Sequence, residues 1–339
     1  MNKFHQELPG VLVVGLISIA VVLITGFVEL SPTILAISMG FLAANLLNLS
    51  SRFESGIKWS ESKALAVAVA LLGLQLNLAI LMQINPVSLA VIVVSIMVTF
   101  LFTFVIAKMF RINAVDSCLL ASGQAICGSA AIMAVASVID SPTKKASTGL
   151  IIAVVNFLGF MGVFIIPWLV TTYFYTDETS SGFVIGNTLQ SMGHVVAAGF
   201  SVSDDVGTHA VIIKMCRILL LIPTLLLVLI YWASYLKLTT SSNNQNQQHV
   251  VNFSWFKMVP LFIWGFLILI IINNMGLVLN ELRHVLIQLG DLLFILAMVA
   301  IGLSIRLKDI WRKGGKLLLL GGLVFAAQII FILLALKLI

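Results

Sequence analysis

The chain has 339 residues, of which 60% are apolar and 9% charged, and its mean hydropathy is +1.14. So few charged side chains cannot cover a water-soluble globule of this size, which excludes the soluble classes and predicts an all-α integral membrane protein in a lipid bilayer. The formal net charge of +6 would suit nucleic acid, but the lysines and arginines are confined to short loops and form no continuous basic face. We therefore expect no nucleic-acid partner.

Apolar segments of about 20 residues, the length that crosses a hydrocarbon core about 30 Å thick, recur along almost the whole chain. No small-residue cleavage site follows the first of them, so we expect it to remain as a span rather than act as a signal peptide. The pattern predicts ten or eleven transmembrane helices, near residues 9–29, 32–48, 62–82, 86–109, 115–138, 146–172, 182–199, 206–236, 255–275, 286–307 and 315–338.

The chain carries no pattern typical of an enzyme or a metalloprotein. Its three cysteines have neither the even count of a disulfide framework nor the spacing of metal ligands. It has no phosphate-binding loop and no nucleophile with a plausible base. We therefore expect no catalytic residue, no metal and no cofactor.

Lysine and arginine are unevenly distributed over the predicted loops. With the amino terminus in the cytoplasm, thirteen fall inside and four outside, the outer ones being Lys144, Lys145, Arg283 and Lys337. This bias predicts a multi-pass protein of the bacterial cytoplasmic (inner) membrane with a cytoplasmic amino terminus and an outer carboxyl terminus. On this topology Asp177 and Glu178 also lie inside.

A polar, low-complexity segment, TTSSNNQNQQ at residues 239–248, follows the eighth predicted span. It is typical of a flexible cytoplasmic linker, about residues 238–253. The spans on either side need not fold separately, so we expect one membrane domain over residues 1–339.

The fifth span contains SGQAICGSAA, a run of small and polar residues that begins at Ser122. One interpretation is a broken helix that lines a pathway, with a half-helix that starts near Gly128 and directs free N–H groups at an anion or a carbonyl. The other is that Gly123 and its small neighbours only let two helices approach closely. The pattern alone leaves both open.

The seventh span, GNTLQSMGHVVAAG at residues 186–199, is similarly poor in bulky residues. Gln190 and His194 are four residues apart, so they would share a helix face with Ser191 nearby. This polar stripe could contact a substrate, and His194 could supply proton coupling. Alternatively, a neutral His194 only forms hydrogen bonds between helices.

The eighth span carries two cations, Lys214 and Arg217, which lie roughly 12 to 17 Å deep if the helix starts at Val206. Cations at such depth are costly unless they pair or face water, so both are candidates for function. If the span starts near Ile212 instead, they could reach the interface. No span has a carboxylate pair at mid-depth, which favours an anionic substrate over a cation exchanger built on buried acids.

A short internal similarity relates LGLQLNLAIL at residues 72–81 to IGLSIRLKDI at residues 301–310. The two segments lie on spans that should run in opposite directions, as an inverted-topology repeat requires.

Four segments together, GLQLNL at Gly73, GQAICGSAA at Gly123, VVAAGFSVS at Val195 and IIKMCRILLLIP at Ile212, resemble the YeiH-type family, whose proposed activity is sulfate export. The resemblance covers nearly the whole chain. It implies inverted repeats and discontinuous, crossed helices around a midplane site, and Lys214 and Arg217 match the family's basic pair. The chain departs at Gln190, Ser191 and His194, where the family usually has His, an acid and Gln.

These observations predict a secondary transporter that moves a small anion, of the sulfate, sulfonate or carboxylate class, by alternating access of two helical bundles. The alternatives are an organic-acid carrier coupled to Na⁺ or H⁺, a membrane sensor or a membrane enzyme; the chain could also form a homo-oligomer. On this hypothesis Arg217→Ala should abolish transport and leave the protein folded. The predicted substrate-binding residues are Gly123, Gln124, Cys127, Gly128, Ser129, Gln190, Ser191, His194, Lys214 and Arg217.

Overall fold

The computed structural model describes residues 3–27, 31–47, 50–75, 85–139, 144–173, 177–221, 223–224, 227–228 and 261–338. Almost all of these residues are helical, and this part of the chain contains no β-strand. The all-α prediction is confirmed. The predicted polar linker, about residues 238–253, lies outside the described residues.

Five of the described helices are long and apolar enough to cross a membrane. They are α1 (Lys3–Thr25), α5 (Pro86–Met109), α8 (Lys144–Tyr173), α15 (Asn280–Ser304) and α17 (Gly315–Ala335). The helices α2 (Pro32–Leu46) and α14 (Leu261–Asn274) are shorter but also apolar. The protein is therefore an integral membrane protein, as its composition predicts.

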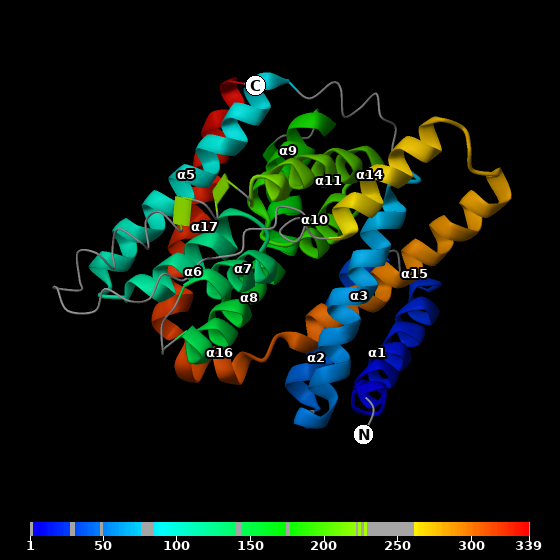
Figure 1. Cartoon of the computed structure of the whole chain (residues 1–339), viewed down its shortest axis with the longest axis horizontal. Coiled ribbons are helices and arrows are strands. Elements are labelled where there is room, and N and C mark those ends of the chain that lie inside the picture. The colour runs from blue at the N-terminus through cyan, green and yellow to red at the C-terminus, as the bar shows by residue number, and fades with distance from the viewer. Residues whose placement is uncertain are drawn as a thin grey trace, which may run out of the picture.

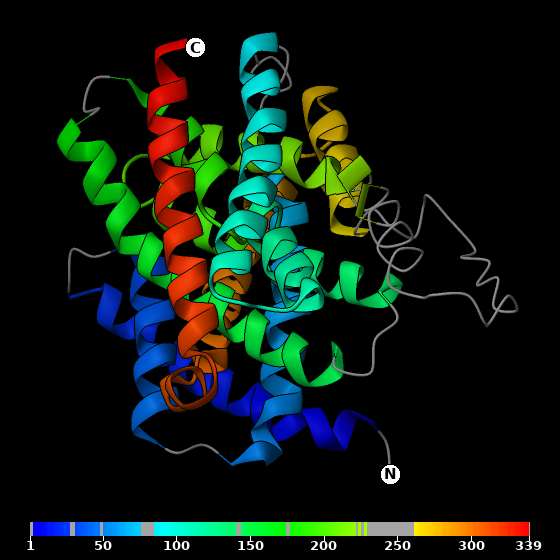
Figure 2. The same ribbon diagram turned by 90° about the vertical axis from the view of Figure 1, so that its left-hand side faces the viewer.

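The helices form two bundles, which are separated in Figure 1. The first bundle consists of α1, α2, α3 (Glu54–Leu72), α14 and α15. Its helices cross at pairs of glycines, Gly10 with Gly56 and Gly40 with the backbone beside Gly302, because only a residue without Cβ permits such a close approach. Figure 2 shows α5, α8 and α17 alongside one another in the second bundle, which also contains the helices α6 to α11 and α16 (Leu307–Lys313).

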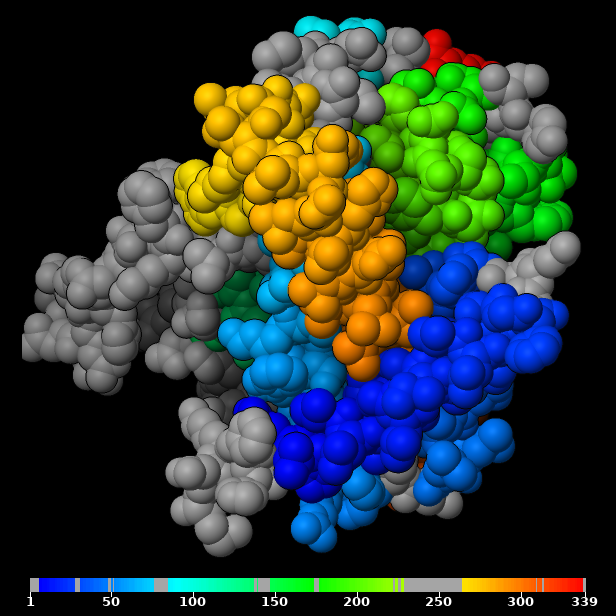
Figure 3. All heavy atoms as spheres, turned by 90° about the vertical axis from the view of Figure 1, so that its right-hand side faces the viewer, coloured from blue at the N-terminus to red at the C-terminus, as the bar shows by residue number. Residues whose placement is uncertain are grey.

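The outer face of the first bundle is apolar. Figure 3 shows α1 and α15 across this face. Large apolar side chains recur there at helical spacing and are exposed, namely Leu12, Leu16, Ile19 and Leu23 on α1 and Leu282, Val285, Leu289 and Leu292 on α15. Such a surface is expected of helices that face lipid.

Within the first bundle α3 and α15 run in opposite directions. Glu54 and Lys58 at the start of α3 line a cavity together with Leu303 and Ser304 at the end of α15. Arg283 at the start of α15 donates to the carbonyl of Leu74 just after α3, at 3.1 Å. The opposite directions of the two similar segments are thus confirmed where the structure describes them. Residues 76–81 of the first segment lie outside the described residues, and the repeat itself stays a prediction.

The segment predicted as the fifth span is a hairpin. The helix α6 (Ala114–Ala125) ends at a turn, and α7 (Ser129–Val138) folds back beside it. A Cβ on Gly123 would lie 2.8 Å from Cγ1 of Ile132, so the first turns of α7 pack against the last turn of α6.

The segment predicted as the seventh span is a second hairpin, made of α9 (Glu178–Thr188) and α10 (Met192–Gly199). The next helix is α11 (Asp204–Leu219). Gly182 of α9 packs on the first turns of α11, and Gly186 of α9 packs on α11 one turn closer to its carboxyl end, which shows that the two helices run parallel. Gly199 at the end of α10 meets Gly207 at the start of α11 after a short turn, so α10 runs opposite to both.

The fifth-span segment is interrupted as the broken-helix interpretation predicts. The seventh-span segment is interrupted too, between α9 and α10, so Gln190 precedes α10 and does not share with His194 the helix face that their spacing predicted. The prediction that each segment crosses the membrane is wrong. The four helices of the hairpins have 12, 10, 11 and 8 residues, and at 1.5 Å per residue none is longer than about 18 Å. Each therefore reaches only about half-way across a hydrocarbon core about 30 Å thick. Hydropathy cannot distinguish one interrupted span from two half-spans, because the composition of both is the same.

The hairpins change the predicted sides of two loops. Gly149 and Leu150, near the start of α8, line a cavity together with Lys58 and Arg306. Residues 144–145 therefore lie on the side predicted as cytoplasmic, not outside. The start of α9 lies beyond the far end of α8, so residues 177–178 lie on the outer side rather than inside. The first correction strengthens the positive-inside bias, which depends on lysine and arginine and hardly on acidic residues.

Cysteine labelling can test the first hairpin, in a background without the three native cysteines. We expect Gly149→Cys to react with a membrane-impermeant maleimide from the same side as Arg312→Cys, since the helix before α8 turns back. A Cβ at position 149 meets nothing within 4 Å, so the substitution fits. Thr179→Cys should react only from the opposite side. If Gly149→Cys reacts from the same side of the membrane as Thr179→Cys, and from the opposite side to Arg312→Cys, the hairpin is contradicted.

Candidate functional site

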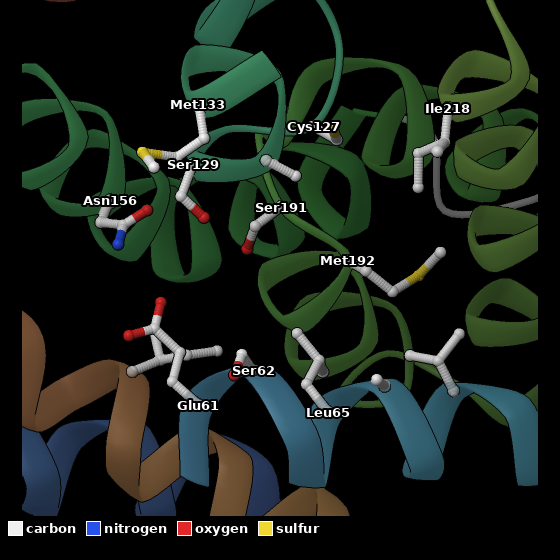
Figure 4. Close-up of a pocket in the computed structure, with 14 residues that line it drawn as sticks. Glu61, Ser62, Leu65, Cys127, Ser129, Met133, Asn156, Ser191, Met192 and Ile218 are labelled. Atoms are coloured by element: carbon white, nitrogen blue, oxygen red, sulfur yellow. The ribbon is translucent and has the colours of Figure 1, made fainter. Parts of the chain in front are cut away.

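A cavity of about 290 Å³ lies between the two bundles, at the tips of the hairpins (Figure 4). One wall is α3 with one residue of α15, and the other wall comes from α7, α8, α10 and α11. The lining residues are Glu61, Ser62, Leu65, Ala66, Val69, Cys127, Ser129, Ala130, Met133, Asn156, Ser191, Met192, Ile218 and Ile301.

The tip of the first hairpin places the amino-terminal end of α7 in the cavity wall. Gly128 directly precedes α7 and has φ 64° and ψ −125°, a conformation that is essentially restricted to glycine. Ser129, the first residue of α7, points its hydroxyl into the cavity in Figure 4. The first-turn N–H groups of a helix have no acceptor within it, so this end carries a partial positive charge.

The tip of the second hairpin places the amino-terminal end of α10 in the same wall. Ser191 caps α10: its Oγ accepts the N–H of His194 at 3.2 Å and lies 2.8 Å from the His194 Nδ1. A Cβ on Gly128 would lie 3.5 Å from the carbonyl oxygen of Gln190, so the two tips are in contact. Two positive helix ends therefore meet at one side of the cavity.

Lys214 and Arg217 lie behind these tips, and both side chains are fully buried. The Lys214 ammonium donates to the carbonyls of Ile126 and Leu189, at 2.6 and 2.5 Å, which are the residues that end α6 and α9. Lys214 thus joins the carboxyl-terminal ends of both half-helices.

Arg217 completes this arrangement. Its guanidinium donates to the carbonyl of Ala125 and, at 3.0 Å, to Oδ1 of Asn187. The sequence predicts that Lys214 and Arg217 contact the substrate, but neither belongs to the cavity lining. In this structure both cations instead satisfy the acceptors that the helix breaks expose.

The other predicted site residues divide in the same way. Cys127, Ser129 and Ser191 line the cavity, and Gly128 shapes its wall. Gln124 and Gln190 are buried behind it: Gln124 donates to the carbonyl of Gly321 at 2.8 Å and accepts from Gln190 at 3.3 Å. Gly123 packs against Ile132, and His194 is buried with no hydrogen-bond partner for its Nε2 among the described residues.

Three polar residues in the cavity lining, Glu61, Ser62 and Asn156, were missed by the sequence analysis. Glu61 lies one residue before the predicted start of the third span, whereas α3 begins seven residues earlier, at Glu54. It shares a helix face with the buried Ile57 and Ala64, and this spacing could have indicated that it faces the protein interior. Asn156 is a buried amide in the middle of the apolar helix α8, and a polar residue at such a position in a membrane helix could have indicated a functional site.

A second chamber of about 390 Å³ adjoins the cavity, because both share Glu61 and Asn156 in their linings. It opens beside Lys58 and Arg306, on the side rich in lysine and arginine. At its rim Lys58 forms an exposed ion pair with Glu54, at 2.6 Å, and this hydrogen bond holds the pKa of the Glu54 carboxyl below its ordinary value. The chamber provides a polar route from one side of the membrane to the helix tips.

Comparison with known proteins identifies the family. A family model described as "Conserved hypothetical protein 698" matches residues 9–321. The chain belongs to this family. It is 28% identical to a UPF0324 membrane protein of Clostridium perfringens, over 98% of this chain and 96% of the relative. It is 29% identical to the UPF0324 membrane protein YdhF of Lactococcus lactis, over 98% of each. The UPF0324 inner membrane protein YeiH of Escherichia coli is 27% identical, over 88% of this chain and 83% of the relative.

The turn at Gly128 can be tested by stability. Gly128→Ala should lower the free energy of unfolding by about 1 to 3 kcal/mol, because a Cβ is strained at this φ. Gly15→Ala is the matched control: position 15 lies within α1, where an added Cβ meets nothing within 4 Å. Thermal unfolding in detergent measures both, and equal midpoints for the two variants would contradict the strained turn.

The bridge at Lys214 can be tested in the same assay. Lys214→Met should cost on the order of 3 kcal/mol, because it leaves two buried carbonyls without a donor. Lys58→Met, which removes an exposed ion pair, should change stability by less than about 1 kcal/mol. For the same reason we expect Arg217→Ala to destabilise the protein, whereas the sequence alone predicted a folded, inactive variant. Wild-type stability in Lys214→Met would exclude the bridging role.

Proposed function

We propose that the protein is a secondary transporter of a small anion, which binds in the cavity at the amino-terminal ends of α7 and α10. The observation that carries this proposal is the asymmetry of the four helix ends at the hairpin tips. The two negative ends, of α6 and α9, are covered by Lys214 and Arg217. The two positive ends are left to face the cavity.

The charges around the cavity favour an anion. Each amino-terminal end acts as roughly half a positive charge, and such an end is a ready anion site because its N–H groups point at the ligand. The hydrogen-bond partners that the described residues offer to Lys214 and Arg217 are all neutral oxygens. Two buried cations without a paired carboxylate add to the positive potential, and a bound anion would balance it.

The position of the cavity favours alternating access. It lies between two bundles, so a movement of one bundle against the other would change which side of the membrane it opens to. The two hairpins enter from opposite sides and meet at their tips, which gives the site similar surroundings in both directions. The relative YeiH is named an inner membrane protein, which supports placing this transporter in the cytoplasmic membrane.

The volume limits the substrate to a small ion. A cavity of about 290 Å³ has room for sulfate, a small sulfonate or a small carboxylate. An organic-acid carrier coupled to Na⁺ or H⁺ would use the same helix ends. The names of these relatives contain no enzyme activity.

A substitution at Ser129 separates anion binding from stability. Ser129→Asp places a carboxylate at the positive end of α7, where it should act as a built-in anion and leave the free energy of unfolding equal or higher. The variant should no longer be stabilised by added anions, whereas wild type should show a rise in unfolding temperature with sulfate, a sulfonate or a small carboxylate. If Ser129 has only a structural role, Ser129→Asp should instead lower the unfolding temperature and leave the anion-induced rise unchanged.

The matched control is Ser129→Asn, which is neutral and close in size to aspartate. It should keep the anion-induced shift at a level close to wild type. Each measurement includes a sodium series at constant anion. Stabilisation by sodium alone, or the same anion shift in wild type and Ser129→Asp, would contradict the proposed site.

A further inference from the structure

One ionisable group in the cavity has no part in the anion site described above. Glu61 lies on α3, in the first bundle, and Figure 4 shows its carboxyl directed across the cavity towards Ser129, Ser191 and Asn156. The positive helix ends belong to the second bundle. The carboxyl and the anion site therefore face one another across the interface between the bundles.

The charged groups around Glu61 do not pair with it. Lys58, one turn earlier on α3, is bound to Glu54, and the described residues contain no other ion pair. On α15 the hydroxyl of Ser304 donates to the carbonyl of Ile301 at 2.8 Å, and Ser304 and Arg306 line the second chamber together with Glu61.

The helices of the second bundle bring no cation into the cavity lining either. The lining residues from α7 and α8 are uncharged. His194 of α10 is buried against Ser191, and Lys214 of α11 is held by two carbonyls. An ionised Glu61 would thus face the same positive helix ends as a bound anion, and the two negative charges would share one cavity.

We propose that Glu61 is a proton-binding site coupled to the anion, so that the anion occupies the cavity together with a protonated Glu61 and not with its carboxylate. This inference rests on the anion site proposed above and adds its coupling ion. One proton is taken from solution for each anion bound, and the only bond formed is the O–H bond of the Glu61 carboxyl. The second chamber, whose lining includes Glu61, provides the proton's route from the side of Lys58 and Arg306.

The physical reason is repulsion in a poorly hydrated space. Two negative charges in one cavity of about 290 Å³ repel far more strongly than in bulk water, because the effective dielectric constant is lower. A protonated carboxyl removes this repulsion and can donate a hydrogen bond to the anion.

The sign of the pH dependence follows from this linkage. If the anion binds only the protonated form, its affinity falls as pH rises through the titration of Glu61, by up to about tenfold per pH unit. By the same reciprocity, anion binding at a pH where Glu61 is ionised must take up protons. Sulfate is the appropriate probe, because its own charge does not change over the neutral pH range.

The first experiment measures sulfate binding and proton uptake by wild-type protein in weakly buffered detergent solution over a series of pH values. We expect affinity to fall with rising pH and close to one proton to be taken up per sulfate at the upper end. Binding without proton uptake at any pH would overturn the proposal without the need for a variant. If wild type binds no anion at any pH, the anion site itself is wrong, which is a distinguishable result.

The second experiment compares two variants. Glu61→Gln imitates the protonated carboxyl, so it should bind sulfate with an affinity independent of pH and without proton uptake. Glu54→Gln, on the same helix at the chamber rim, is the matched control and should behave as wild type. If Glu61→Gln keeps the pH dependence and the proton uptake of wild type, the assignment to Glu61 is wrong. Loss of both in His194→Gln would then identify His194 as the group that binds the proton.

Discussion

The structure depends on one buried ammonium group. Lys214 is hydrogen bonded to the carbonyls that end α6 and α9, so a single side chain holds the tips of two hairpins that enter from opposite sides. Non-helical backbone at membrane depth is stable only where the protein itself satisfies the freed polar groups. Lys214 and Arg217 provide this at the acceptor ends, and without them the breaks would leave several buried carbonyls unsatisfied.

This arrangement also explains why the site should select anions without a cation in its lining. The lysine and arginine are used for the negative helix ends, which leaves the positive ends of α7 and α10 for a ligand. A ligand bound by backbone N–H groups need not displace a side chain that holds the hairpins together. Under the proposed function, stability and binding therefore involve different groups at the same place, and the proposed proton site, Glu61, lies on the opposing bundle.

Much of this could be predicted from the sequence. The composition requires a helical membrane protein, and the glycines and polar residues around Gly128 indicate where one helix breaks, whereas the break before Ser191 was not predicted. Lys214 and Arg217 were correctly singled out as buried cations that need partners. The predicted direction of the chain after each break was wrong, because hydropathy indicates whether a segment lies in the membrane but not in which direction it runs. The hydrogen-bond partners of the two cations could not be predicted for a related reason. Every residue has a carbonyl, so the sequence does not show which carbonyls will accept the hydrogen bonds.

The sequence by itself determined that the protein lies in a lipid bilayer, that its fold is helical, which segments are irregular and which residues are costly to bury. These follow from transfer free energies and backbone geometry, which act locally along the chain. Only the tertiary structure decided that both irregular segments are hairpins, that Lys214 joins them, and that Glu61 faces the resulting cavity. These features arise from contacts between segments far apart in the sequence, such as Lys214 and Ile126, which are 88 residues apart. No local pattern specifies which of many buried donors and acceptors will meet.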